Sequence, residues 1–166
     1  EEVLKIRLSV YGENHSRVAS VYNDIGEIYS VQGDDFKALD YFKKSLKIVL
    51  SVYGENHSQV SSIYDHIGEI YFAQKDYSKA LYYFEESLKI RLSLFGENHP
   101  EVALSYYSIG SLYIIQGDKS KALNYYEKSL KIRLSVYGEN HPLTKEIMDL
   151  INVANSKVLQ SPETTK

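Results

Sequence analysis

The sequence contains no cysteine and no tryptophan, and only three of its 166 residues are proline. Without cysteine the chain can form neither disulfides nor thiolate metal sites, which suits a reducing compartment, so we expect a cytoplasmic protein. The 19 lysine and arginine residues are outnumbered by 22 acidic residues, which gives a net charge of −3. Because nucleic acids are bound through basic surfaces, we expect no nucleic-acid partner.

Long apolar runs are also absent from the sequence. No stretch approaches the roughly 20 apolar residues that a membrane helix requires, and no signal peptide opens the chain, so we expect no membrane association. The sequence has no phosphate-binding glycine loop, no HExxH motif and no cysteine nucleophile. No serine, histidine and acid are marked out as a catalytic set. We therefore expect neither an enzyme nor a cofactor.

Repetition dominates what is present. The octapeptide LSVYGENH, or its near copy LSLFGENH, occurs four times: at Leu8–His15, Leu50–His57, Leu92–His99 and Leu134–His141. The constant interval of 42 residues divides the chain into three repeats and a partial fourth: 4–45, 46–87, 88–129 and 130–159. Such a period is typical of a solenoid, in which each unit buries its apolar face against its neighbours. We expect one array over residues 1–160 and a disordered tail over 161–166.

Within one repeat the apolar pattern predicts two helices. In the second repeat, apolar residues at three- and four-residue spacings predict a first helix at about Ser58–Gln74 and a second at about Tyr77–Phe95. Between them, Lys75 takes the place of a helix-closing glycine and Asp76 suits the N-cap of the second helix. This pattern predicts an all-α fold, a right-handed α-solenoid of stacked antiparallel helix pairs.

The octapeptide is interpreted as the joint between helix pairs. In its second copy Gly54 lies where a left-handed C-cap belongs, and His57 opens the next helix. A metal site is the alternative, built from the four joint histidines: His15, His57, His99 and His141. Equivalent residues in the stack should lie roughly 20 Å apart, because adjacent helices are about 8–10 Å apart. Zinc–nitrogen bonds are about 2 Å long, so we expect no metal. A fifth histidine, His66, is expected in a groove or on the surface rather than in a catalytic site.

The repeat columns resemble the tetratricopeptide motif. In the second repeat its aromatic, isoleucine–glycine, tyrosine, alanine, phenylalanine and small-residue positions are matched in order: Tyr64, Ile67–Gly68, Tyr71, Ala80, Phe84 and Ser87. The usual unit has about 34 residues, and the extra residues here lie after Phe84. The stretch LKIRLSLFGENHPEVA, Leu88–Ala103, is similar to the 42-residue variety found in kinesin light chains.

Small residues in the motif predict how the two helices of a pair pack. The glycines of the three repeats should mark a close approach of the helices: Gly26, Gly68 and Gly110. Alanines of the second helix should face them: Ala38, Ala80 and Ala122. The hydroxyls of three serines should bond to a carbonyl one turn earlier in their own helix: Ser45, Ser87 and Ser129.

The resemblance implies that the first helix of each repeat lines a concave, partner-binding groove. Nine residues are predicted to face it: Asn23, Glu27, Ser30, Asp65, Glu69, Phe72, Tyr107, Ser111 and Ile114. Each repeat could address a different part of a ligand; alternatively, exposed positions vary freely. The first two repeats place three acids and no base there, and the third is apolar. We therefore expect a protein or peptide segment with basic residues near one end and an apolar residue near the other.

Three hypotheses about function remain. The first is a protein–protein interaction scaffold that holds a peptide or helical segment in its groove. The second is a structural spacer or self-associating array, in which near-identical units stack end to end. The third is an enzyme, which no motif supports. The segment Glu1–Tyr11 corresponds to the end of a second helix, as if the chain were cut from a longer array or padded with half a unit. The segment Pro142–Leu159 predicts a terminal helix with a polar outer face.

Overall fold

The computed structural model describes residues 2–156, and every regular element within them is a helix. The helices of this part of the chain are α1 (Glu2–Tyr11), α2 (Ser16–Val31), α3 (Asp35–Tyr53), α4 (Ser58–Ala73), α5 (Tyr77–Phe95), α6 (Pro100–Ile115), α7 (Lys119–Tyr137) and α8 (Pro142–Ser156). They belong to two compact units, one ending at Leu94 and the other beginning at Phe95. The predicted tail at 161–166 and the predicted end of the last helix at 157–159 lie outside the described residues.

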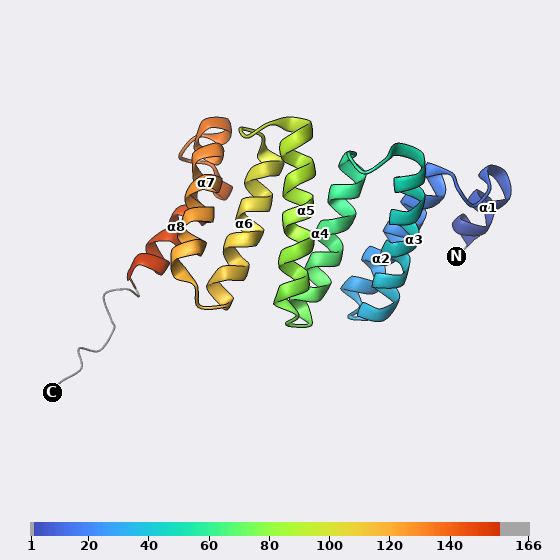
Figure 1. Cartoon of the computed structure of the whole chain (residues 1–166), viewed down its shortest axis with the longest axis horizontal. Helices are drawn as coiled ribbons and strands as arrows, with labels where there is room; N and C mark the ends of the chain where they lie inside the picture. The colour runs from blue at the N-terminus through green and yellow to red at the C-terminus, as the bar shows by residue number, and fades with distance from the viewer. Residues whose placement is uncertain (1, 157–166) are drawn as a thin grey trace. The chain divides into compact units, whose positions relative to one another are not determined.

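Within each unit, successive helices pack side by side. In the first unit α2 packs on α3 and α3 on α4, and in the second α6 packs on α7 and α7 on α8, with the chain reversing at each turn (Figure 1). The two helices predicted for the second repeat are confirmed as α4 and α5, with Gln74 as the C-cap of α4. Among residues 2–156, no helix is both long and apolar enough to cross a membrane.

The turn inside each helix pair has one form in all three repeats. After α2, Gly33 adopts a φ of +76°, and Asp34 accepts a hydrogen bond from the N–H of Lys37 at 3.2 Å as the N-cap of α3. The same acceptor role is confirmed at the two equivalent aspartates, Asp76 and Asp118. Lys75 adopts a φ of +62° at the position of Gly33, a left-handed conformation that strains a residue with a Cβ atom.

The close approach predicted at the motif glycine is confirmed, and an aromatic ring of the second helix makes the closest contact. A Cβ atom at Gly68 would lie 2.7 Å from the ring of Phe84. The equivalent rings cover the glycines of the other two repeats: Phe42 over Gly26 and Tyr126 over Gly110. The aromatic ring one turn beyond the alanine makes the closest contact, and at Gly110 the backbone carbonyl oxygen of Ala122 also lies 3.3 Å from the same Cβ position.

The motif serines also bond differently from the prediction. The hydroxyl of Ser45 in α3 donates to the carbonyl of Ala19 in α2 at 2.8 Å, and Ser129 in α7 donates to Ala103 in α6 at 2.7 Å. The predicted bond within the serine's own helix is wrong at both positions, since close packing brings a carbonyl of the first helix within reach. Ser87 is buried and makes no hydrogen bond to any part of the chain that the structure describes.

Tyrosine columns join the two helices of each pair. Stacked rings lie 5.6–5.7 Å apart in all three repeats: Tyr29 on Tyr41, Tyr71 on Tyr83 and Tyr113 on Tyr125. A lysine ammonium lies over the first ring of each stack, at 4.8–5.0 Å: Lys37, Lys79 and Lys121. The recurring tyrosines are therefore part of the packing between helices.

Candidate functional site

The four joint histidines are helix N-caps. In every copy the imidazole Nδ1 accepts a hydrogen bond of 3.1–3.2 Å from the backbone N–H two residues further on. The ring also packs on the aromatic side chain four residues earlier; the centroids of Tyr53 and His57 are 4.2 Å apart. The interpretation of the octapeptide as a structural joint is confirmed. Among residues 2–156, no group of three or more His, Asp or Glu side chains is placed to hold a metal ion.

The glycine of the joint departs from the predicted conformation. Gly54 has φ +78° and ψ −177°, and Gly138 has φ +79° and ψ 170°, whereas a left-handed helical residue would have ψ near +47°. The chain leaves the helix extended because it must reach the N-cap of the next one. This region of backbone space is essentially restricted to glycine.

Predicted site residues of the first unit lie together on α2 and α4. The amide nitrogen of Asn23 donates to the Glu27 carboxylate at 2.6 Å, and Nε2 of His66 lies 3.8 Å from the same carboxylate. His66 is therefore part of the surface where α2 meets α4, and its ring packs on Phe42 with centroids 5.0 Å apart. Ser30 is exposed one turn further along α2.

The acidic character predicted for this surface needs correction. Arg91, near the end of α5, is only 4% exposed, and its Nη2 lies 2.7 Å from Oδ2 of Asp65. The prediction of three acids and no base considered only the first helices, whereas the second helix supplies the base. Of the three acids, Glu27 and Glu69 remain exposed to solvent.

Two titratable side chains of α4 have shifted pKa values. Burial lowers the pKa of His66, with a smaller lowering by Arg91 that is opposed by the Glu27 carboxylate. Partial burial and the neighbouring Asp65 raise the pKa of Glu69. Phe72, one turn beyond Glu69, is half-buried and packs edge-on against Tyr77 with centroids 5.9 Å apart. The described α4 surface is thus polar in its middle and aromatic at its end.

In the second unit the predicted residues occupy α6. The hydroxyl of Tyr107 donates to Oε1 of Glu146 in α8 at 2.9 Å, and the guanidinium of Arg133 in α7 lies 4.9 Å from the centre of the Tyr107 ring. Arg133 also donates to the Leu143 carbonyl at 2.6 Å. Tyr107 was predicted as part of an apolar end, but its hydroxyl belongs to a polar cluster.

The rest of the α6 column is less polar. The hydroxyl of Ser111 donates to the Tyr107 carbonyl at 3.0 Å and lies 3.2 Å from the hydroxyl of Tyr126. Ile114 is 36% exposed and borders an apolar hollow of about 180 Å³ that Leu150 and Val153 of α8 also line.

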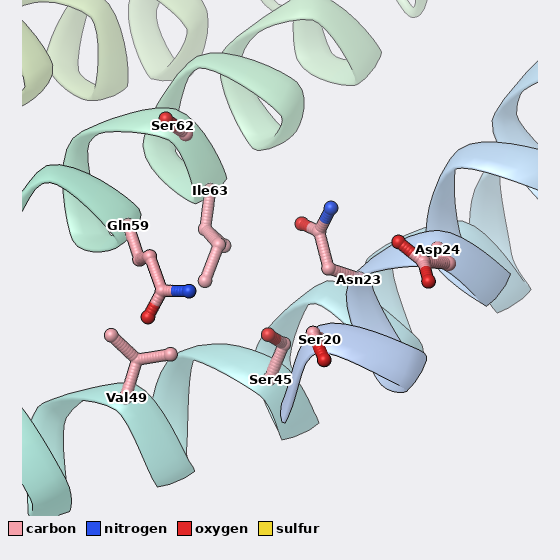
Figure 2. A pocket seen from close by; sticks show the side chains of 8 residues that line it. All are labelled: Ser20, Asn23, Asp24, Ser45, Val49, Gln59, Ser62 and Ile63. Atoms are coloured by element: carbon pink, nitrogen blue, oxygen red, sulfur yellow. The ribbon is translucent and has the colours of Figure 1, made fainter. Parts of the chain in front are cut away.

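A cavity of about 100 Å³ lies where α2, α3 and α4 meet (Figure 2). Its wall includes Asn23 from α2, Val49 from α3 and Gln59 from α4. Figure 2 shows the amides of Asn23 and Gln59 on opposite sides of the space, with Val49 closing it next to Gln59. Only Asn23 of these was predicted from the sequence.

Sequence reasoning missed the second-helix residues of this surface, although a signal was present. The column that holds Val49 in the first repeat holds Arg91 and Arg133 in the next two. The opposing first-helix column changes with it, from Asn23 to Asp65 and Tyr107. Reading the two columns together would have indicated that an arginine meets an acid or an aromatic ring there.

Comparison with known proteins agrees with this architecture. The tetratricopeptide repeat family model matches the chain over residues 17–93 and 59–135. No curated protein matches the sequence. The crystal structure of BtubC (BKLC) from P. vanneervenii is similar with a TM-score of 0.77 at 20% identity, covering 99% of this chain and 74% of that one.

Two further structures are similar. The nearly identical TPR-like repeats of a Podosopora anserina protein named as a kinesin light chain give a TM-score of 0.71 at 14% identity, covering 96% of this chain and 85% of that one. The N-terminal domain of stress-induced protein-1 (STI-1) from C. elegans gives a TM-score of 0.63 at 17% identity, covering 84% of this chain and 96% of that one. These likenesses confirm the predicted α-solenoid of helix pairs.

Proposed function

Because the chain belongs to the tetratricopeptide repeat family, we propose that it is a protein–protein interaction scaffold that binds a peptide or helical segment of a partner on its first-helix faces. Tetratricopeptide repeats are generally non-catalytic scaffolds, and the cytoplasmic location expected from the sequence is part of this proposal. That the nine predicted residues contact the partner, and that residues 1–160 form one array, stay predictions.

One observation carries the proposal: the predicted first-helix columns change from repeat to repeat on a framework that recurs. The joints, the glycine–aromatic contacts and the tyrosine stacks recur from repeat to repeat with nearly the same distances. In the first unit, Oε1 of Glu27 in α2 lies 3.8 Å from Nε2 of His66 in α4, so the two first helices form one surface. Side chains that vary on a repeated framework can each address a different part of a ligand.

The described side chains narrow the chemistry of the partner. Exposed acids on α2 and α4, Glu27 and Glu69, favour a segment with basic residues, although the ion pair of Asp65 with Arg91 makes the surface less acidic than the sequence implied. In the second unit the hollow beside Ile114 favours an aliphatic or aromatic side chain. We expect modest affinity, because a disordered segment loses conformational entropy when it binds.

Charge reversal on the first helices tests the proposal. Segments that bind the full chain would be selected from a random display library and their Kd values measured for the variant Glu27→Lys with Glu69→Lys. We expect selective loss of segments rich in bases, because like charges then meet, and weaker binding as salt rises. The control is Lys47→Glu, an exposed position on α3. Loss with the control but not with the first-helix variant would contradict the proposal.

A self-associating array is a second candidate, favoured by the apolar face of α1. Val3, Ile6 and Val10 lie on one side of this helix and are 57%, 56% and 62% exposed. The residue equivalent to Ile6 in the second helix of the first repeat, Ile48, is only 5% exposed. Analytical ultracentrifugation across a range of concentrations tests this candidate: self-association through α1 should be abolished by Ile6→Asp, and a monomer at all concentrations would contradict it.

A further inference from the structure

Two buried acceptors without donors lie in the wall of the cavity where α2, α3 and α4 meet, beside the apolar side chains of Val49 and Ile63. Oδ1 of Asn23 and Oε1 of Gln59 are buried and accept no hydrogen bond from any residue that the structure describes. The amide nitrogen of Asn23 is already used, because it donates to Glu27 at 2.6 Å. The exposed carboxylate of Asp24 also borders the space. A buried acceptor without a donor is costly, so this wall is complementary to a group rich in donors.

The three serines of the cavity wall add further acceptors. The hydroxyls of Ser20, Ser45 and Ser62 each donate to a backbone carbonyl, at 3.0, 2.8 and 3.1 Å. Each serine oxygen therefore has lone pairs left but no hydrogen to offer. Lysine and arginine are positively charged side chains that carry several donors and no acceptor, and arginine presents five donors in a planar fork.

The equivalent position of the second unit shows which group fits such a junction. There the residue two repeats after Val49 is Arg133, which is 4% exposed. Its guanidinium lies 4.9 Å from the centre of the Tyr107 ring, 3.6 Å from Oε2 of Glu146 and 2.6 Å from the Leu143 carbonyl oxygen. Tyr107, Leu143 and Glu146 stand two repeats after Asn23, Gln59 and Ser62. The same helix geometry therefore accommodates a guanidinium between these columns.

We infer that the cavity receives an arginine side chain of the partner segment, in the place that the chain's own arginine fills at the other junction. This inference rests on the scaffold function proposed above and names the group that the first unit recognises. The guanidinium donates to Asn23 Oδ1 and Gln59 Oε1, and its positive charge is favoured by the Asp24 carboxylate, which borders the cavity, and by the Glu27 carboxylate, which is bonded to Asn23. A cavity of about 100 Å³ has room for a planar group that displaces water.

The test uses the full chain and a small arginine probe. N-acetyl-arginine methylamide would be titrated while the side-chain amide NMR signals of Asn23 and Gln59 are followed. We expect saturable shifts of both signals, and none with the citrulline analogue, which has a similar shape but no charge. The variant Val49→Arg places an internal arginine in the cavity and should abolish the shifts. Val31→Arg adds the same charge at a 91% exposed site on α2 and should leave them unchanged.

A second variant keeps the test valid if Val49→Arg folds poorly. Gln59→Leu installs the residue found two repeats later and removes one acceptor without changing the charge. This variant should raise the Kd of the arginine probe about ten-fold, as expected for loss of a charged hydrogen bond. Equal shifts with the citrulline analogue, or unchanged arginine binding in both variants, would overturn the inference.

Library selection separates failure of this inference from failure of the proposed function. Segments selected on the wild-type chain should be enriched in arginine over lysine, and that enrichment should vanish on Val49→Arg. Segments that bind without any preference for arginine, equally well to both chains, would leave the scaffold function standing and overturn the arginine site. If no segment binds, the scaffold function fails, and the titration still decides whether the cavity takes a guanidinium.

Discussion

The junction of α2, α3 and α4 in the first unit and that of α6, α7 and α8 in the second have the same framework but different contents. In both, a serine of the second helix bonds to a carbonyl of the first, at 2.8 Å for Ser45 and 2.7 Å for Ser129. In both, an aromatic ring covers a glycine. Val49 leaves a cavity at the first junction, whereas Arg133 occupies the second and contacts Tyr107.

This difference shows that one column decides whether a junction is open or internally filled. The arginine is nearly buried and is compensated by an aromatic ring, a carbonyl and a half-exposed carboxylate. Where valine replaces it, the surrounding residues are amides and serines. Equivalent junctions of one chain can thus either be filled by an internal arginine or leave a cavity.

The largest effect is expected when the filled junction is emptied. Arg133→Val should lower the free energy of unfolding by about 2 kcal/mol, because it removes hydrogen bonds and leaves Glu146 without its cation; the loss is limited since Glu146 is 46% exposed. Chemical denaturation of the variant measures it. Lys131→Val removes the same charge from an exposed position of α7 and should change stability little. Equal effects of the two variants would show that the arginine does not stabilise the junction.

The converse change should fill the open junction. Val49→Arg with Asn23→Asp reproduces the pairing of Arg91 with Asp65, so the double variant should be more stable than the sum of the single changes by about 1 kcal/mol. A double-mutant cycle measured by denaturation gives this coupling. Val60→Arg is the control, since Val60 is as buried as Val49 but does not border the cavity, and it should destabilise by more than about 3 kcal/mol. Absence of coupling would show that the first junction cannot form the ion pair that Arg91 and Asp65 make.

Unlike the two junctions, the octapeptide joints of the two units should respond equally to mutation. His57→Ala in the first unit and His141→Ala in the second each remove an N-cap acceptor and should each cost about 1 kcal/mol. Replacement by Asn, itself a good N-cap, should restore most of that stability. Hydrogen exchange of the first turns of α4 and α8 would report each loss locally. A loss at one joint only would contradict the equivalence.

The smallest expected effect is a pH dependence of stability. Only the first unit should show it at the position of His66, because the equivalent residue of the second unit is Ser108. Burial lowers the pKa of His66 below its ordinary value of 6.5, so the folded chain binds this proton less readily than the unfolded chain. The resulting stability is full above pH 6.5 and is lost as the pH falls through the folded-state pKa. His66→Ser, which installs the residue of the third repeat, should flatten the fall in stability below pH 6.5. Thermal melts between pH 5 and 7.5 measure it, and an unchanged pH dependence would exclude His66 as the source.

The framework could be predicted from the sequence because it depends on local spacing that recurs. The 42-residue period, the helix bounds around Lys75 and the N-cap at Asp76 all follow from residues close together in the chain. The ψ angle of Gly54 could not be predicted, because a glycine at a helix end indicates a positive φ without specifying ψ.

The contents of the site were harder to predict because they depend on pairs from different helices. The ion pair of Arg91 with Asp65 joins residues of α5 and α4, and periodicity within one helix says nothing about which second-helix side chain reaches the first-helix face. The cavity beside Val49 also depends on Gln59 of the following repeat. The paired variation of two columns was the available signal, and it becomes visible only when the helices are placed together.

The stacked tyrosines make the two units optically separable. With 16 tyrosines and no tryptophan, the natural chain has no indole absorption or emission. The rings of Tyr41 and Tyr125 are the second members of equivalent stacks, one in each unit. A single tryptophan introduced at either position would lie against a tyrosine of its own unit, so its emission spectrum would report the unfolding of that unit alone.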